Sequence, residues 1–300
     1  MDSVKRVLVY GDAIVDRYDI VTPLKPSAEA PVLVCRQEST SYRPGGAANV
    51  AVNVASMGPV VTLLSYGSDD ADHDVWLADE LEGVMLFQQI YGRASALKTR
   101  IVDAHFRQLL RIDDEATNLP EVTAQYLLDF ALNYISNFDV ICISDYAKGC
   151  ADHDMLRKLI YLAEKHDKYV VVNSKPSNIH QLVGASLIVV NFSEAVEALN
   201  LLGNPQDESW KLAPAGVALG LSSRLDDTPI LLTKGEEGMW LADESVHHTY
   251  AHPVQVADIT GAGDTVVATI AAHGCHTPEV LKLAARNAAS VVTKQGVATP

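Results

Sequence analysis

The sequence lacks an apolar run long enough to cross a membrane, since none approaches the ~20 residues of a spanning helix. The run at residues 7–10, close to Met1, is too short for a signal peptide and has the wrong flanks. Only four cysteines are present, and they form neither a C-x-x-C pair nor a paired framework, which favours a reducing compartment. We therefore expect a cytoplasmic protein with no membrane contact.

Positive charge is also scarce, because 23 lysines and arginines stand against 38 acidic residues, for a net charge of −15. Nucleic acids and anionic membranes are bound by clustered basic residues, so neither is an expected partner. In so acidic a chain, a phosphorylated substrate would need basic side chains close to its phosphate to offset the negative charge of the protein. No repeat, low-complexity stretch or linker divides the 300 residues, which are enough to bury the core of one large domain.

Short β-branched strands alternate with helical segments along most of the chain. From residue 120 onward the expected elements are a helix at 123–135, a strand at 140–144, a helix at 154–166, strands at 169–173 and 187–191, and a helix at 194–201. This alternation predicts an α/β fold whose mainly parallel sheet is covered on both faces. Residues of about 17–42, which hold three prolines, and 96–112 break the pattern. We expect them to form a small β lid on a single domain of residues 1–300.

The most informative segment is Asp258–Thr265, in which a Gly-Ala-Gly turn precedes Asp264 and an apolar helix follows. Small residues let a ligand approach the backbone, and the unpaired N–H groups at a helix start attract an anion, most often a phosphate. A carboxylate at this place would repel a phosphate, so we expect Asp264 to take a proton from an attacking hydroxyl. The alternative is a tight turn in which Asp264 only caps the helix.

Together with the rest of the chain, this segment resembles the C-terminal signature of the PfkB (ribokinase-like) carbohydrate kinases, with Ile259 as a mild variation. The Gly-Gly-Ala-Ala-Asn segment at 45–49 looks like the N-terminal signature, Asn191–Glu194 like the N-x-x-E motif, and Thr233–Gly238 like the glycine turn beside the nucleotide. The likeness covers essentially the whole chain. It implies the ribokinase-like three-layer sandwich, with a mainly parallel central sheet and a small β lid.

Several segments look like one subgroup of that family, which phosphorylates D-glycero-β-D-manno-heptose 7-phosphate, a lipopolysaccharide precursor, at the anomeric hydroxyl. These segments are Gly11–Tyr18, Ala28–Pro31, Arg43–Asn49, Gln108–Asp113 and Ser144–Gly149. Bifunctional members also carry an adenylyltransferase domain, which we do not expect here because no H-x-G-H motif occurs before Pro300. The resemblance implies an ATP- and Mg²⁺-dependent kinase of this sugar phosphate. The alternatives are another acceptor (ribose, fructose phosphate or adenosine) and a non-catalytic binding protein of the same fold.

The resemblance also implies roles on the acceptor side. Asp264 would be the general base, while the amides of Gly261, Ala262 and Gly263 would bind charge on the transferred phosphoryl group. Positions that hold the sugar in relatives are matched by Asp16, Gly45, Gly46, Asn49 and Asp145. Candidate cations for a phosphate on the acceptor are Lys175, which is favoured by its motif position, Lys148, Arg107 and Arg111. The alternative for Asp16 and the glycine pair is that they only form turns.

On the nucleotide side, the resemblance implies that Asn191 and Glu194 organise Mg²⁺ through water, although the pair also suits an ordinary helix start. Asp258 and Thr260 match positions at which some relatives bind a monovalent cation, for which K⁺ is the candidate. The full set of expected nucleotide contacts is Asn191, Glu194, Lys234, Gly235, Gly238, Thr260 and Asn287. A surface lysine and a helical asparagine are equally typical of residues that bind no ligand.

Two departures from the family pattern lie on the acceptor side. Relatives usually read Asp-Pro-Lys-Gly where this chain reads Asn-Ser-Lys-Pro at 173–176. The segment between Arg100 and Gln108 is one residue longer than in the heptose subgroup, with Ala-His-Phe at 104–106 in place of an Arg-His pair. Kinase chemistry is still expected, but the identity of the sugar stays open.

An exposed strand edge in the lid would also suit a homodimer.

Overall fold

The computed structural model describes residues 4–68, 71–81, 86–91, 94–115, 121–151, 153–203 and 213–300. From one edge to the other, the strands of its main sheet are β13 (Val246–Thr249), β12 (Met239–Ala242), β11 (Ile230–Thr233), β10 (Leu187–Asn191), β9 (Tyr169–Ser174), β8 (Val140–Asp145), β1 (Arg6–Gly11), β4 (Val60–Gly67) and β5 (Leu86–Tyr91). Neighbours from β11 to β5 pair in parallel, whereas β12 and β13 add antiparallel pairs at one edge.

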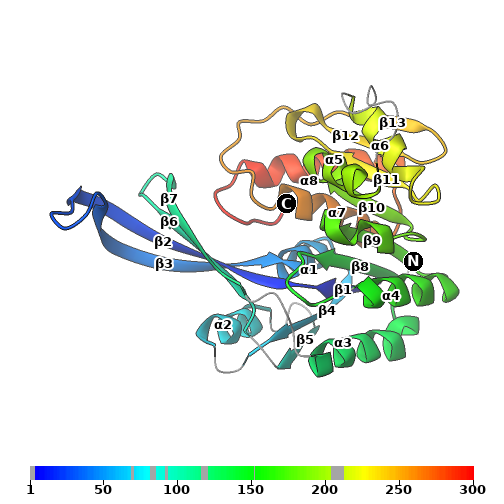
Figure 1. The fold of residues 1–300 in the computed structure, drawn as a ribbon, viewed down its shortest axis with the longest axis horizontal. Coiled ribbons are helices and arrows are strands. Elements are labelled where there is room, and N and C mark those ends of the chain that lie inside the picture. Colours follow the sequence, from blue (N-terminus) through cyan, green and yellow to red (C-terminus); the bar gives the residue numbers. More distant parts are fainter. Residues whose placement is uncertain are drawn as a thin grey trace.

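Helices cover both faces of the main sheet (Figure 1). One face is covered by α3 (Glu121–Tyr134), α4 (His153–Lys165), α5 (Phe192–Leu201) and α6 (Pro214–Ser222), and the other by α1 (Ala47–Ser56), α2 (Asp72–Leu81), α7 (Ala262–His273) and α8 (Pro278–Val292). Successive strand residues point to opposite faces, so Leu8 packs in one core and Val9 in the other. The predicted fold class, a three-layer α/β sandwich, is confirmed.

The central strands are mostly apolar until their carboxyl ends. β8, for example, reads Val-Ile-Cys-Ile-Ser-Asp and is buried at every residue, because helices cover both of its faces. The polar residues come last, as in Ser144 and Asp145. Since parallel strands end at the same edge of the sheet, the loops that follow them meet there, and ligand groups gather at such an edge.

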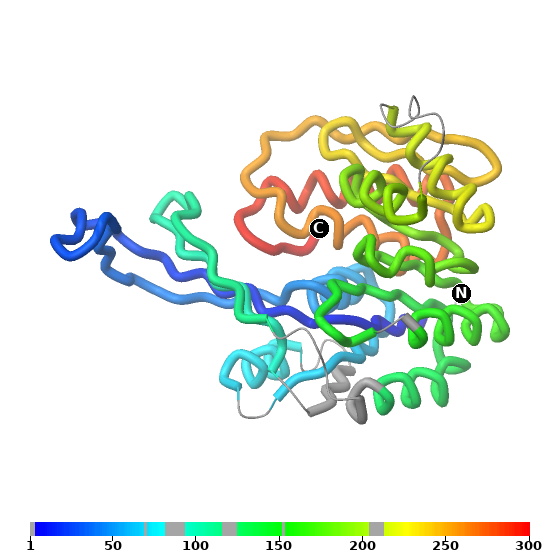
Figure 2. The backbone as a smooth tube through the Cα atoms, viewed as in Figure 1, coloured from blue at the N-terminus to red at the C-terminus, as the bar shows by residue number. Residues whose placement is uncertain are grey.

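A second sheet, called here the small sheet, has the strand order β3 (Leu33–Gly46), β2 (Ala13–Pro26), β6 (Ala96–Val102) and β7 (Gln108–Asp114). β2 pairs antiparallel with β3 and parallel with β6, which pairs antiparallel with β7. The four strands project together from one side of the main body (Figures 1 and 2). This sheet contains the segments assigned to a lid, whose closing motion stays a prediction.

The C-terminal residues pass beside the base of the small sheet, where the red end of the tube approaches β2 (Figure 2). A Cβ atom built on Gly296 would lie 3.5 Å from the hydroxyl oxygen of Tyr18 on β2. The C-terminal segment therefore lies against β2 of the small sheet. Within the described ranges, no helix has the length and apolar character needed to cross a bilayer.

Candidate active site

Asp264 lies in the first turn of α7, where three distant segments converge. Its Oδ2 accepts a 2.7 Å hydrogen bond from Asn49 Nδ2, and its Oδ1 accepts one of 2.5 Å from the Tyr146 hydroxyl. The residue at the helix N-cap is Gly261, and no side chain makes a capping hydrogen bond, so the capping alternative for Asp264 is wrong. The side chain keeps some accessible surface, yet burial raises the pKa of Asp264, while its two hydrogen bonds oppose that shift.

The side chain of Asn49 is oriented by a second asparagine one turn further along α1. Asn53 Nδ2 donates to Asn49 Oδ1 at 2.8 Å, which leaves Asn49 Nδ2 as the group that faces Asp264. Asn53 is fully buried, and its Oδ1 accepts a 3.3 Å hydrogen bond from Thr265 Oγ1. The two amides therefore link α1 to the start of α7. Sequence reasoning identified Asn49 and missed Asn53, for which the four-residue spacing was the available signal.

The glycines before Asp264 allow a close approach of α1 and α7. Gly261 has a φ of 82°, in the left-handed region that favours glycine, and a Cβ there would lie 3.0 Å from Asn49 Nδ2. A Cβ on Gly263 would meet no atom within 4 Å, so this first turn of α7 borders open space. The first N–H groups of a helix have no partner inside it. The amides around Ala262 are thus suited to an anion, although that role stays a prediction.

Tyr146 is presented by a loop whose backbone is anchored on a buried carboxylate. Asp12 accepts hydrogen bonds from the backbone N–H groups of Tyr146 at 2.8 Å, Lys148 at 3.0 Å and Cys150 at 2.9 Å. Burial raises the pKa of Asp12 to about 6, and the nearby Asp145 adds to the shift. We did not predict Tyr146 as a site residue. The signal for both Tyr146 and Asp12 was their place just after a buried strand.

Asp145 supports the same loop instead of facing a ligand. It is 1% exposed, and its carboxylate accepts hydrogen bonds from Ser174 Oγ, from Asn178 Nδ2 at 2.7 Å and from the N–H of Ala147 at 2.8 Å. Ala147 has a φ of 56°, an unusual conformation for a residue with a side chain, which these contacts hold in place. The structure therefore gives no support to a substrate contact by Asp145.

The remaining acceptor residues meet at the base of the small sheet. Asp16 of β2 forms an ion pair with Arg100 of β6. A Cβ on Gly45 would lie 2.6 Å from Asp16 Oδ2, and one on Gly46 would lie 2.5 Å from the backbone oxygen of Asp12. These approaches explain the glycine pair in physical terms. The structure thus brings Asp16 and both glycines to the same corner as Asn49.

Lys175 lies between Tyr146 and the expected nucleotide side. Its Nζ is 2.7 Å from Glu194 Oε1 and 5.2 Å from the centre of the Tyr146 ring. Burial has the largest effect on the pKa of Asp264 and raises it. The charge of Lys175 lowers that pKa, although less than the two hydrogen bonds do. The lysine favoured for an acceptor phosphate therefore lies beside the residue expected to organise Mg²⁺.

Two further lysines lie on the small-sheet side of Tyr146. Lys98 Nζ is 5.8 Å from the ring centre and 3.8 Å from Glu115 Oε1, and Lys148 forms an ion pair with the same Glu115. The two ammonium groups share the carboxylate of Glu115. Lys148 was expected in the site, whereas Lys98 was not identified from the sequence.

Arg107 lies apart from these residues. It forms an ion pair with Asp103, with 2.6 Å between Nη2 and Oδ2, and its side chain is 76% exposed. Arg111 pairs with Asp113 at 2.8 Å on β7. The structure therefore shows Arg107 as an exposed side chain paired with Asp103, and its contact with substrate stays a prediction.

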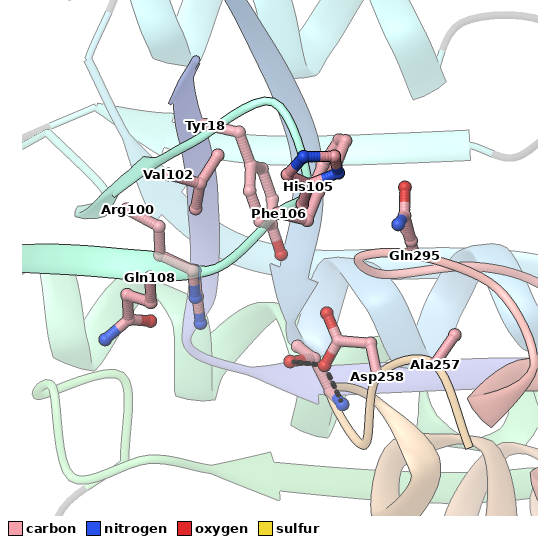
Figure 3. A pocket seen from close by; sticks show the side chains of 10 residues that line it. Tyr18, Arg100, Val102, His105, Phe106, Gln108, Ala257, Asp258 and Gln295 are labelled. Atoms are coloured by element: carbon pink, nitrogen blue, oxygen red, sulfur yellow. Dashed lines mark hydrogen bonds between the residues drawn. The ribbon is translucent and has the colours of Figure 1, made fainter. Parts of the chain in front are cut away.

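A cavity of about 220 Å³ lies where the small sheet meets the loop before α7 (Figure 3). Figure 3 shows the Tyr18 hydroxyl and the Arg100 guanidinium pointing toward the side where Asp258 lies. Two residues of the longer segment between β6 and β7, His105 and Phe106, line the cavity. Because Arg100 also pairs with Asp16, this cavity adjoins the acceptor corner, and the unusual 104–106 segment contributes to its wall.

Asn191 and Glu194 form a capping box at the start of α5. Asn191 Oδ1 accepts from the N–H of Glu194 at 2.9 Å, and Glu194 Oε2 accepts from the N–H of Asn191 at 3.3 Å. The helix-start alternative thus describes what both side chains do. Their oxygen atoms at an accessible edge still fit a water-mediated Mg²⁺ role. Among the described residues, no three His, Cys, Asp or Glu side chains group as metal ligands.

The other predicted nucleotide residues make local contacts. Lys234 Nζ pairs with Glu237 at 2.8 Å and lies 4.6 Å from the centre of the Phe192 ring. Gly235 opens a short 3₁₀ turn. Gly238 has a φ of 96°, and a Cβ atom there would lie only 2.2 Å from the backbone oxygen of Thr249, so the position has no room for a side chain. These contacts form a compact turn between β11 and β12.

Asn287 and Thr260 are also engaged within the protein. Asn287 Nδ2 donates to Thr269 Oγ1 at 3.1 Å, which connects α8 to α7. Asp258 Oδ1 accepts from the N–H and hydroxyl of Thr260 at 2.9 and 2.7 Å, and Asp258 Oδ2 accepts from the N–H of Gly296 at 3.1 Å. Asp258 therefore fixes the loop before α7 against the C-terminal segment, and cation binding there stays a prediction.

Comparison with known proteins supplies the family context for this geometry. The chain is 37% identical over 300 residues to the bifunctional protein HldE of Pseudomonas savastanoi pv. phaseolicola, an alignment that covers 97% of this chain and 61% of that protein. It is 35% identical over 297 residues to HldE of Campylobacter jejuni subsp. doylei, with 97% and 62% covered. The chain thus spans about three-fifths of the length of these relatives.

Solved structures share the fold. A mutant of phosphofructokinase-2 from Escherichia coli matches with a TM-score of 0.80 at 16% identity, covering 99% of this chain and 96% of that chain. The same enzyme in complex with potassium matches with a TM-score of 0.78 at 17% identity, covering 98% and 94%. The model of the pfkB family carbohydrate kinases matches residues 4–300. This chain therefore belongs to the pfkB family of carbohydrate kinases.

Proposed function

We propose that this chain transfers the γ-phosphoryl group of ATP to the anomeric hydroxyl of D-glycero-β-D-manno-heptose 7-phosphate. The observation that carries the proposal is Asp264, a partly buried carboxylate held at the start of α7 by two distant segments. The family supports phosphoryl transfer to a sugar, and the resemblance to the heptose subgroup supports this acceptor. Because the donor is ATP, we expect the enzyme to act in the cytoplasm.

In the proposed reaction, Asp264 takes the proton of the acceptor hydroxyl while that oxygen attacks the γ-phosphorus. The bond to the oxygen bridging the β- and γ-phosphorus breaks, and ADP leaves. The amides of Gly261 and Gly263 face the charge that develops on the phosphoryl group. Bound Mg²⁺ neutralises phosphate charge, and Asn191 with Glu194 would hold its water ligands. Asp16 and Asn49 orient the sugar.

A phosphate on the acceptor requires local positive charge in a chain of net charge −15. Residues that pair across neighbouring strands share a face of the small sheet, and the pairs Asp16–Lys98 and Tyr18–Arg100 place both cations on the face that carries Asp16. Around Asp16 and Tyr18, the charged residues in register on this face are Arg43, Lys98, Arg100, Arg111, Asp16 and Asp113. Together with Glu115, which pairs with Lys98, three carboxylates stand against these four cations, and the remaining positive charge supports the binding of a phosphorylated sugar.

A coupled assay of ADP release tests the proposal. Purified enzyme with Mg²⁺-ATP is supplied in turn with heptose 7-phosphate, fructose 6-phosphate, ribose and adenosine. The highest kcat/KM is expected with heptose 7-phosphate, and Asp264→Asn serves as the inactive control. A clear preference for another acceptor would replace the heptose in the proposal and keep the kinase. Thermal-shift binding without turnover for every sugar would favour a non-catalytic binding role.

The opposite face of the small sheet supports a homodimer. Its residues Leu110 and Ile112 are 53% and 51% exposed on β7, paired with Ile101 and Thr99 of β6. A second copy of this sheet could cover these apolar side chains, which share the face with the ion pair of Arg17 and Asp19. Sedimentation of the wild type and of Leu110→Glu/Ile112→Glu measures this directly. We expect a dimer that dissociates in the variant, and a monomeric wild type would contradict the inference.

A monovalent cation is the last part of the proposal. Asp258 and Thr260 lie in the loop before α7, and one structural neighbour, phosphofructokinase-2, was solved in complex with potassium. Bound near this loop, K⁺ would stabilise the turn that presents the amides before Asp264. We expect a higher rate in potassium than in tetramethylammonium salts of equal ionic strength, whereas equal rates would remove the cation from the account.

A further inference from the structure

Tyr146 makes a direct contact with the general base that the reaction above does not use. Its hydroxyl donates to Asp264 Oδ1 at 2.5 Å, while Asn49 donates to Oδ2 at 2.7 Å. A hydrogen bond to a carboxylate stabilises the charged form and so weakens it as a base. With a donor on each oxygen, Asp264 is a poorer proton acceptor for a third hydroxyl than a carboxylate with one donor.

The loop that carries Tyr146 is fixed at several points. Three of its N–H groups donate to Asp12, and the N–H of Ala147 donates to the buried carboxylate of Asp145. The backbone is therefore held firmly, and the Tyr146 hydroxyl can leave Asp264 only by rotation of the side chain. Such a rotation needs a competing group that binds strongly at the same carboxylate oxygen.

The groups around Tyr146 distinguish a sugar from water. Lys98 and Lys175 approach its ring at 5.8 and 5.2 Å, and its surroundings raise the Tyr146 pKa well above its ordinary value, chiefly through burial and then through Asp264, so it remains a proton donor. A sugar held by Asp16 and the nearby cations can use its binding energy to displace this hydroxyl. A single water molecule has no such anchoring and gains little by displacing it.

We propose that Tyr146 is a positioning residue that protects the base from water, so that Asp264 becomes an effective base only when an anchored acceptor hydroxyl displaces the Tyr146 hydroxyl. This inference rests on the proposed kinase reaction and is independent of which sugar is phosphorylated. Its function is to suppress wasteful hydrolysis of ATP, a side reaction that kinases limit by controlling water at the site.

The test is ATP hydrolysis without any sugar, measured for the wild type and for Tyr146→Phe. The substitution removes one hydroxyl oxygen and leaves Asp264 Oδ1 to accept from water. That water gives its proton to Asp264, its oxygen bonds to the γ-phosphorus, and the bond to the bridging oxygen breaks to give ADP and phosphate. We expect hydrolysis to rise at least about tenfold, part of the ~10²–10⁴ that a general base supplies. An unchanged or lower rate would overturn the proposal.

Two controls make the result specific. The double variant Tyr146→Phe/Asp264→Asn should lose the added hydrolysis, because water activation needs the carboxylate; retention of it would also overturn the proposal. Tyr161→Phe removes a hydroxyl from an exposed side chain on α4 and should hydrolyse ATP like the wild type. Equal melting temperatures for Tyr146→Phe and wild type would show that the fold is kept.

A second readout follows the acceptor. With a sugar that the wild type phosphorylates, the amount of sugar phosphate formed per ADP should be near one for the wild type and clearly below one for Tyr146→Phe. A ratio that stays near one would contradict the protective role. If heptose 7-phosphate is not turned over but sugar-free hydrolysis rises as expected, the acceptor proposal fails while the role of Tyr146 stands.

Discussion

The acceptor side and the nucleotide side of Asp264 are held together in different ways. On the acceptor side, side chains are fixed by partners far away in the sequence, as in Asn49 with Asp264, 215 residues apart, and Asp12 with the N–H of Tyr146, 134 residues apart. On the nucleotide side several contacts are local, such as Asn191 with Glu194, three residues apart, although Asn287 bonds to Thr269 across 18 residues. The first set is largely buried and the second largely accessible.

This difference indicates which part of the site is formed before any ligand binds. Long-range buried hydrogen bonds form only when the whole domain folds, so the base and its donors are positioned by tertiary structure. A local ion pair such as Lys234 with Glu237 is weak and exchanges its partner at little cost, typically ~0–1 kcal/mol. The acceptor side is therefore preorganised, whereas the nucleotide side can rearrange around phosphates.

The largest effect is expected from removal of the base itself. In Asp264→Asn, turnover should fall at least about a hundredfold, because a general base contributes ~10²–10⁴ in rate. ATP should still bind, since the nucleotide side is built from separate local contacts. Rapid-quench turnover and ATP titration measure the two properties. A near-normal rate in this variant would remove Asp264 from the mechanism.

A buried residue behind the base should have the next largest effect. Asn53→Ala leaves Asn49 free to turn away from Asp264, so kcat should fall roughly tenfold, as expected for a positioned hydrogen bond of about 1.4 kcal/mol. The free energy of unfolding should also decrease by about 1–3 kcal/mol.

The matched change on the nucleotide side is Glu237→Gln, which breaks an exposed ion pair. It should change kcat by less than about twofold and the free energy of unfolding by no more than the ~0–1 kcal/mol of a surface ion pair. Equal losses in both variants would contradict the contrast.

Two lysines separate the sides further. Lys148 lies with Glu115 near the small sheet, so Lys148→Ala should raise KM for a phosphorylated acceptor roughly ten- to hundredfold while KM for ATP changes little. Lys175 lies beside Glu194 and Tyr146, so Lys175→Ala should lower kcat and raise KM for ATP as well. Steady-state kinetics with both substrates varied distinguishes these patterns. The same change in both variants would mean that one phosphate site uses both lysines.

A smaller effect concerns pH. Burial raises the pKa of Asp264, and the nearby charge of Asp16 adds to the rise. The hydrogen bonds from Tyr146 and Asn49 and the charge of Lys175 lower the same pKa. Because the base must be deprotonated, kcat/KM should fall as pH decreases, along an acid limb that lies above the ordinary range of an aspartate. In Tyr146→Phe the pKa should rise further, so the acid limb should move to higher pH. A limb that stays in place would show that the contact has no influence on the base.

The same contrast explains what the sequence could and could not predict. Strands such as β8 and β9 were predictable because their apolar runs are buried on both faces. β13, with the sequence Val-His-His-Thr, and the short helix α6 were not predicted, because neither shows a clear apolar period.

Within the site, residues that belong to local motifs were recognisable, as with Asn49, Asp264 and the Asn191–Glu194 pair. Residues that act through distant partners were not, because a sequence does not show which side chains meet. Tyr146 and Asn53 belong to this second group. Lys175 was identified, but its neighbour Glu194 places it closer to the nucleotide than its motif indicated.

The most direct measurement is a crystal structure with the acceptor sugar and a non-hydrolysable ATP analogue bound together. The account predicts the acceptor hydroxyl within ~2.6–3.2 Å of an Asp264 carboxylate oxygen, the reach of a general base, with the terminal phosphate at the start of α7 and the Tyr146 hydroxyl displaced. A sugar hydroxyl bound far from Asp264, with the Tyr146 contact intact, would contradict it.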